Sequence, residues 1–127
     1  MLKYRKGSRV ERELLQYFHL HGFLVIRSAG SGVSKLAPDA LVFKGGKQYA
    51  FEIKAHETER LSIKEEQYEL LKRWEKEAGI TAFVVWKKKR MPFLFIPLKF
   101  MKKARKHYTI SFKEALNAFK KEDLVFS

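Results

Sequence analysis

Two short acidic motifs are the residues of this chain best suited to chemistry. The sequence contains only two aspartates, Asp39 and Asp123, and a single Glu-x-Lys triplet, Glu52-Ile53-Lys54. Gly45-Gly46 lies midway between the two motifs and is typical of a two-residue hairpin turn. In an antiparallel hairpin with that turn, Asp39 stands opposite Glu52, at a Cβ separation of about 4.5–5.5 Å. Because side chains alternate along a strand, Lys54 projects from the same face as Glu52.

Two carboxylates and an ammonium group at one place predict metal-dependent hydrolysis of a phosphodiester. Paired carboxylates repel each other unless a cation lies between them, and hard oxygen ligands suit Mg²⁺. The ion would polarise the phosphodiester and activate a ligated water, while Lys54 orients that water or offsets charge in the transition state. The alternative is that Asp39 is an ordinary residue at the start of a strand, and that Glu52 and Lys54 form a solvated strand face.

The spacing of apolar residues predicts the elements that must position these motifs. In chain order we expect a helix over 7–21, a strand over 23–27, a Ser- and Gly-rich loop over 28–36, hairpin strands over 39–44 and 47–54, a helix over 63–78, strands over 80–86 and 93–98, and a last helix over 111–121. Ser62 with Glu65 and Ser111 with Glu114 are the expected capping boxes of the last two helices. From Phe100 onward no motif is recognisable, and this segment is expected only to cap the fold.

The order α-β-β-β-α-β-β-α predicts an α/β fold with a central mixed β-sheet flanked by helices. No internal repeat and no Pro/Gly/Ser-rich linker divides the chain, so we expect a single domain over residues 1–127. The run Met91–Leu98 is too apolar for an exposed edge, and is expected in the core or in a dimer interface.

The composition is strongly basic. Lysines and arginines number 27 against 14 aspartates and glutamates, which gives a formal net charge of +13. Such an excess repels itself in a compact fold and is typical of a protein that binds a polyanion, above all nucleic acid. Basic clusters at 3–9, 87–90 and 102–106 are candidate phosphate contacts. The alternative is a Lys- and Glu-rich surface of the thermophile type.

Several classes of protein are not expected. The chain has no cysteine, which excludes a disulfide framework, a thiolate zinc site and a cysteine nucleophile. No apolar run approaches the roughly 18 residues of a membrane span, and the cations are not gathered on one amphipathic helix, so we expect no membrane association. We expect a soluble protein of the cytoplasm, associated with the nucleoid.

Six short motifs follow one another along roughly the first 100 residues. They are Tyr4-Arg5-Lys6-Gly7, Glu11-Arg12-Glu13-Leu14, His21-Gly22-Phe23, Arg27-Ser28-Ala29-Gly30-Ser31, Pro38-Asp39 and Glu52-Ile53-Lys54. In this order they resemble the archaeal Holliday junction resolvases of the Asp…Glu-x-Lys nuclease superfamily. The resemblance implies a restriction-endonuclease-like fold and a Mg²⁺-dependent endonuclease that makes paired symmetric cuts in four-way DNA junctions, in homologous recombination and repair. Two opposed cuts require two active sites, so we expect a homodimer.

The resemblance also implies which residues form the catalytic site. Glu11, Asp39 and Glu52 match the acidic residues that hold the metal ion in that family, and Lys54 matches its catalytic lysine. A serine of the 28–36 loop, taken as Ser31 rather than Ser28 or Ser34, is expected to assist near the scissile strand. Considered without the resemblance, the favoured explanation of Glu11 is structural: a glutamate near a helix start interacts favourably with the helix dipole, and this helix face can simply be solvated. Gln67 resembles a glutamine that some relatives in the wider superfamily place near the site, but the favoured interpretation is a surface residue of an amphipathic helix.

The resemblance further implies that Arg12 and Arg27 contact or support phosphate. Arg5, Lys6 and Lys35 are expected DNA contacts because of their positive charge. Two other functions remain open: a nuclease of the same superfamily that cuts linear or nicked duplex DNA, and a non-catalytic architectural protein that binds junctions without consuming them. An RNA-binding module is disfavoured because no aromatic stacking signature is present.

Overall fold

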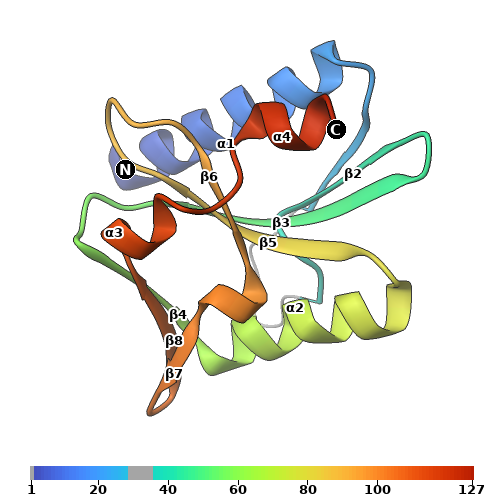
Figure 1. Cartoon of the computed structure of the whole chain (residues 1–127). Helices are drawn as coiled ribbons and strands as arrows, with labels where there is room; N and C mark the ends of the chain where they lie inside the picture. The colour runs from blue at the N-terminus through green and yellow to red at the C-terminus, as the bar shows by residue number, and fades with distance from the viewer. Residues whose placement is uncertain (1, 29–35) are drawn as a thin grey trace.

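A five-stranded mixed sheet forms the centre of the chain (Figure 1). The structure is a computed structural model that describes residues 2–28 and 36–127, with the side chains of the first helix described from Gly7 onward. The strands lie in the order β1-β2-β3-β5-β6, where β1 is Leu24–Arg27, β2 Ala40–Lys44, β3 Lys47–Ala55, β5 Thr81–Lys87 and β6 Leu94–Pro97. Only β3 and β5 run parallel, so the predicted mixed sheet is confirmed.

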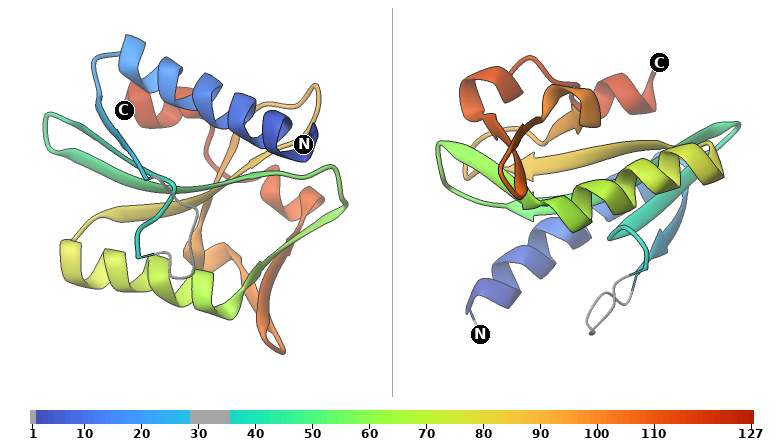
Figure 2. Two further views of the ribbon diagram at one scale, coloured as in Figure 1. Left: turned by 180° about the vertical axis from the view of Figure 1, so that it is seen from behind. Right: turned by 90° about the horizontal axis from the view of Figure 1, so that it is seen from below.

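One long helix covers each face of this sheet (Figures 1 and 2). Helix α1, Leu2–Leu20, packs on one face through Leu14 and Phe18, which are fully buried against β3 and β6. Helix α2, Glu65–Ala78, packs on the other face through Tyr68 and Leu71. The two apolar clusters therefore lie on opposite faces of β3, whose side chains alternate between them.

A second sheet of three antiparallel strands stands beside the end of β3. It has the order β4-β8-β7, where β4 is Arg60–Lys64, β8 His107–Ser111 and β7 Lys102–Ala104. The 3-10 turn η1, Leu98–Phe100, leads into it, and the short helices α3, Phe112–Ala115, and α4, Lys121–Val125, follow it. The expectation that residues after Phe100 only cap the fold was therefore wrong.

The predicted capping box of Ser62 with Glu65 was also wrong. Ser62 lies within β4, where its hydroxyl donates to Thr109 Oγ1 at 3.3 Å, and α2 begins only at Glu65. The alternation along β4 explains the difference, because Leu61 and Ile63 are buried while their neighbours are exposed. Pairing with β8 keeps this segment extended, and the helix starts after the last paired residue.

The boundaries of the other elements lie closer to the predicted ones. Helix α1 begins at Leu2 rather than at Gly7. The capping box of Ser111 and Glu114 is confirmed, and hydrogen bonds from Ser111 hold the pKa of the Glu114 carboxyl below its usual value. The helix it opens is short, because Phe119 leaves the helical path and forms a bridge with Phe95 of β6. The apolar run through β6 is buried within the single chain, so it belongs to the core.

The β7–β8 hairpin is tied to the first turn of α2. The backbone N–H of Glu65 donates to the Lys106 carbonyl at 2.9 Å, and Lys103 Nζ lies 2.9 Å from Glu65 Oε2, which raises the pKa of Lys103. The rings of Tyr68 and Tyr108 stack with centroids 3.5 Å apart, and burial raises the pKa of Tyr68. In the part of the chain that the structure describes, no helix is long and apolar enough to cross a membrane.

The second sheet is expected to unfold together with the first. Ile110 of β8 is 1% exposed within the cluster that α2 shares with the central sheet. Ile110→Ala should therefore lower the free energy of unfolding by about 2–5 kcal/mol and leave a single transition in urea, followed by circular dichroism and Trp fluorescence. His107→Ala, at an exposed position of β8, is the control and should change the free energy of unfolding by less than about 0.5 kcal/mol. Two separate transitions for the parent chain would contradict the prediction.

Candidate active site

The β2–β3 hairpin brings the two acidic motifs together in the predicted register. Ala40 pairs with Phe51 and Lys44 with Lys47 across the Gly45-Gly46 turn, so the ladder continued by one residue places Asp39 opposite Glu52. Asp39 directly precedes β2, and its Oδ2 accepts a hydrogen bond from the backbone N–H of Ile53 at 2.8 Å. This bond fixes the aspartate against the strand that carries the Glu-x-Lys motif.

Glu52 is buried, which is unusual for a carboxylate. Among the described residues it is the only charged side chain in the buried class, with 3% of its surface exposed. Its Oε2 lies 3.8 Å from Lys54 Nζ, and the Lys54 side chain retains 19% exposure. The same-face placement of Glu52 and Lys54 is therefore confirmed. Because an ionised carboxylate is costly to bury without compensating charge, this position favours a nearby cation.

Gln67 of α2 belongs to this site, and its interpretation as a surface residue was wrong. Its side chain is half-buried, Nε2 lies 3.4 Å from Glu52 Oε2, and Oε1 accepts from the backbone N–H of Lys64 at 3.1 Å. The residue thus closes the N-terminal cap of α2 and contacts the buried carboxylate. No capping motif marked Gln67 in the sequence, because Lys64, three residues before it, is not one of the Ser, Thr, Asp or Asn residues typical of an N-cap.

Glu11 lies on α1 and pairs with Arg27 of β1. Arg27 Nε donates to Glu11 Oε1 at 2.6 Å, and Arg27 stands opposite Ala40, next to Asp39. Helix α1 packs on the face of β3 opposite to the one from which Glu52 projects. Accordingly, residues 2–28 and 36–127 contain no group of three or more His, Asp or Glu side chains close enough to hold a metal ion. The structure brings Asp39 and Glu52 together and leaves Glu11 on the Arg27 side.

The remaining predicted residues are only partly placed. Arg12 is exposed on α1 and its guanidinium donates to Ser8 Oγ at 2.9 Å. Arg5 and Lys6 lie in α1, but their side chains are outside the described part. Ser31 and Lys35 lie outside the described residues, while the N–H of Ser28 donates to the Asp39 carbonyl at 2.8 Å. The predicted roles of these residues stay predictions.

Asp39 and Glu52 form a donor set of oxygens only, with an ammonium group beside it. Such oxygens are the ligands that Mg²⁺ prefers, and a lysine near two carboxylates is suited to contact the oxyanion of a phosphodiester. The arrangement on adjacent strands of a mixed sheet, with a helix on each face, is that of a nuclease of the restriction-endonuclease-like fold.

Comparison with known proteins identifies the family. The sequence model described as "Archaeal holliday junction resolvase (hjc)" matches residues 2–126. The chain therefore belongs to the archaeal Holliday junction resolvase family, as its short motifs indicated.

Individual relatives agree with this assignment. The chain is 33% identical over 106 residues to the crossover junction endodeoxyribonuclease Hjc of Archaeoglobus fulgidus, which covers 83% of this chain and 78% of the relative. It is 43% identical over 70 residues to the protein of the same name from Methanocaldococcus jannaschii, covering 54% of this chain and 49% of that relative. The solved structure of Archaeoglobus fulgidus Hjc superimposes with a TM-score of 0.85 at 25% identity, over 96% of this chain and 97% of that one.

The two contacts of Gln67 predict a measurable effect on stability. Gln67→Met keeps the length of the side chain but removes the acceptor for the Lys64 N–H and the donor toward Glu52. The free energy of unfolding should fall by about 1 kcal/mol, measured by urea denaturation. Gln48→Met, at an exposed position of β3, is the matched control and should change it by less than about 0.5 kcal/mol. Equal effects of the two substitutions would contradict the contacts.

Proposed function

We propose that this chain cleaves four-way DNA junctions by Mg²⁺-dependent hydrolysis of phosphodiesters, with paired symmetric cuts, in homologous recombination and repair. The observation that supports it most is the buried Glu52, in contact with Lys54 and on the strand paired with that of Asp39, in a chain of this family with a net charge of +13. A buried carboxylate in a basic protein is suited to a site where a cation and a phosphate meet.

Asp39 and Glu52 are the residues that would hold the metal ion. Mg²⁺ supplies a Lewis acid that polarises the phosphodiester and lowers the pKa of a bound water. The bond from the Ile53 N–H occupies one side of Asp39 Oδ2 and holds the carboxylate in place. In this proposal Glu11 completes the acidic site from α1. This requires its carboxylate to leave its hydrogen bond with Arg27 and turn toward Asp39 and Glu52.

Lys54 acts on the reacting phosphate. Its ammonium group lies 3.8 Å from Glu52 Oε2 and is accessible from solvent, so it can approach both the buried carboxylate and an incoming phosphate. From there it donates a hydrogen bond to the attacking water or to a phosphate oxygen, where charge develops in the transition state. Arg27, which is half exposed, and Arg12 would contact phosphates beside it, as would Arg5, Lys6 and Lys35, with Ser31 near the scissile strand.

Cleavage assays test this function directly. The purified chain should cut a labelled four-way junction in Mg²⁺ at two symmetric positions, and should neither cut it in EDTA nor cut a linear duplex of the same sequence. Asp39→Asn, Glu52→Gln and Lys54→Ala should each slow the cutting by at least about 10²-fold while junction binding persists. Glu66→Gln, on an exposed residue of α2, is the control and should cut at the parental rate.

Other outcomes would select the alternative functions. Equal cutting of linear or nicked duplex would identify a general endonuclease of the same superfamily. Tight junction binding without cutting under any divalent metal would leave the architectural protein. Full activity of Glu52→Gln would remove Glu52 from the site.

The proposed activity needs two active sites, and the fold offers an apolar surface for a second copy. Leu24 and Ile26 of the edge strand β1 are 73% and 56% exposed on one face, opposite Phe43 and Leu41 of β2. Leu36, 78% exposed, lies beside α2, because Trp74 Nε1 donates to its carbonyl at 3.2 Å. We assign this surface to a homodimer, since apolar side chains so exposed are typical of an interface.

Disrupting this surface should separate dimerisation from folding. Leu24→Glu and Ile26→Glu place a charge on the exposed face of an edge strand, so the chain should sediment as a monomer while its circular dichroism is unchanged. The monomer should nick junctions on one strand rather than cut two strands in a concerted way. Leu116→Glu, at an exposed leucine of the turn after α3, is the control and should remain dimeric. Unchanged sedimentation of both β1 variants would exclude this surface.

A further inference from the structure

The turn from β5 to β6 is the most basic feature near the active site that the proposed function does not use. From Ala78 to Lys113 the chain carries ten lysines and arginines and no carboxylate. Four of these cations are consecutive, Lys87 to Arg90. Lys87 pairs with Ala55 across the parallel strands, one residue after Lys54, so the turn begins beside the active-site end of β3.

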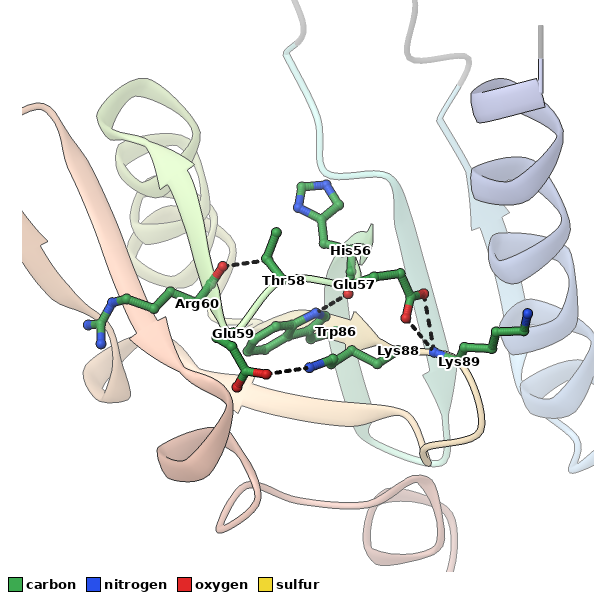
Figure 3. Close-up of polar contacts among 8 residues, drawn as sticks. All are labelled: His56, Glu57, Thr58, Glu59, Arg60, Trp86, Lys88 and Lys89. Atoms are coloured by element: carbon green, nitrogen blue, oxygen red, sulfur yellow. Dashed lines mark hydrogen bonds and ion pairs between the residues drawn. The ribbon is translucent and has the colours of Figure 1, made fainter.

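Within this turn, two cations contact neighbouring groups of the protein and two are exposed. Lys87 Nζ donates to the carbonyl of Lys88 at 2.8 Å. The Lys88 ammonium lies 4.1 Å from the centre of the Phe112 ring and 4.0 Å from Glu59 Oε1, with only 14% of the side chain exposed. Lys89 and Arg90 are exposed, and Figure 3 shows the Lys89 side chain directed toward α1.

A polar hollow of about 310 Å³ lies between this turn and α1. Four cations from two elements line it: Arg9 from α1, and Lys87, Lys89 and Arg90 from the turn. Val10, Glu13 and Glu57 complete the lining. Arg9 and Glu13, one helical turn apart on α1, both line the hollow, whereas Glu11 points away from it, about 200° around the helix from Arg9. Cations converging from a helix and a turn are suited to a single anionic group with several oxygens.

Glu57 fixes the turn, and the hollow still has two more cations than carboxylates, four against Glu57 and Glu13. Both of its carboxylate oxygens accept from the backbone N–H of Lys89, at 3.1 and 3.2 Å (Figure 3). The loop that carries Glu57 is itself held at β5, because Trp86 Nε1 donates to the carbonyl of His56 at 2.9 Å. These contacts hold the backbone of the turn, while the exposed side chains of Lys89 and Arg90 line the hollow.

Arg90 adopts a backbone conformation that an arginine does not favour. Its φ is +63°, in the left-handed region that glycine and asparagine adopt at lower energetic cost than other residues. A turn selected for stability alone would place glycine or asparagine there. An arginine held in this conformation by the surrounding turn points to a function for its side chain.

We propose that Arg9, Lys89 and Arg90 form a subsite for a backbone phosphate of DNA, next to the phosphate that is cut, and that Glu57 is its positioning residue. The inference rests on the proposed function and extends it from the reacting phosphate to a neighbouring one. Such a contact holds the strand in register without selecting a base, as an enzyme that recognises branching requires.

Binding in EDTA tests the subsite independently of cleavage. Dissociation constants for a four-way junction are measured over a range of KCl concentrations. Arg9→Ala, Lys89→Ala and Arg90→Asn, the last chosen because asparagine tolerates the left-handed backbone, should each weaken binding and reduce the slope of log K against log salt. Because the three residues share one phosphate, the triple variant should lose no more than about one phosphate contact. Lys76→Ala, on α2 at the opposite end of the central sheet, is the charge-matched control and should keep the parental slope.

Methylphosphonates identify the phosphate that is contacted. Junctions with one uncharged methylphosphonate at successive positions flanking the cut should reveal a position that weakens binding of the parent but not of Arg90→Asn. Glu57→Ala should lose the same discrimination, and Glu57→Gln, which keeps an acceptor for the Lys89 N–H, should restore it. Parental slopes for all three cation variants, or an equal methylphosphonate effect in parent and variants, would overturn the subsite.

The two proposals fail separately. A chain that binds junctions through this subsite but does not cut them would refute the proposed cleavage and keep the subsite. A chain that cuts junctions with no change of slope in the variants would keep the cleavage and refute the subsite.

Discussion

The burial of the Glu52 carboxylate is the constraint on which the arrangement of the site depends. A carboxylate with 3% exposure is stable in a fold only where dipoles and cations compensate for lost hydration. Lys54, Gln67 and the neighbouring strand of Asp39 provide this environment, and each comes from a different structural cause: strand alternation, a helix cap and a hairpin register. A slip of one residue in the β2–β3 ladder would turn Glu52 to the α1 face and separate it from Asp39 and Gln67.

The second sheet contributes to the same site from a distance. Its β7–β8 hairpin bonds to Glu65, the first residue of α2, and Gln67 in the same turn contacts Glu52. The buried carboxylate, the helix start and a strongly basic hairpin are therefore connected through a few residues. Because these contacts involve backbone groups as well as exposed ion pairs, the connection does not depend on weak surface salt bridges alone. The C-terminal quarter of the chain is thus part of the framework that supports Glu52.

The elements that the sequence predicted correctly are those set by local rules. The two glycines of the turn determined the register of Asp39 and Glu52, and α2 ends at Ala78 as predicted, followed by Gly79 with φ of +67°. The features that were missed depend on partners far along the chain. Strand β4 is extended because it pairs with β8, more than forty residues away, and the approach of Gln67 to Glu52 follows from that pairing. The pairing of Glu11 with Arg27 likewise joins residues on different elements, which no local pattern specifies.

The distribution of charge decides between the two explanations of the basic composition. A thermophile surface interleaves cations and anions in ion-pair networks, and α2 has this character, with Glu65, Glu66, Glu69, Glu75 and Glu77 among its lysines and arginine. The segment 78–113 does not, because its ten cations have no carboxylate among them. Mutual repulsion within that segment is a cost to the isolated fold, and the ion pairs of Lys88 with Glu59, Lys102 with Glu114 and Lys103 with Glu65 offset it only in part. The cost falls when a polyanion is bound, so the uneven distribution is itself an argument that cations of this segment contact DNA.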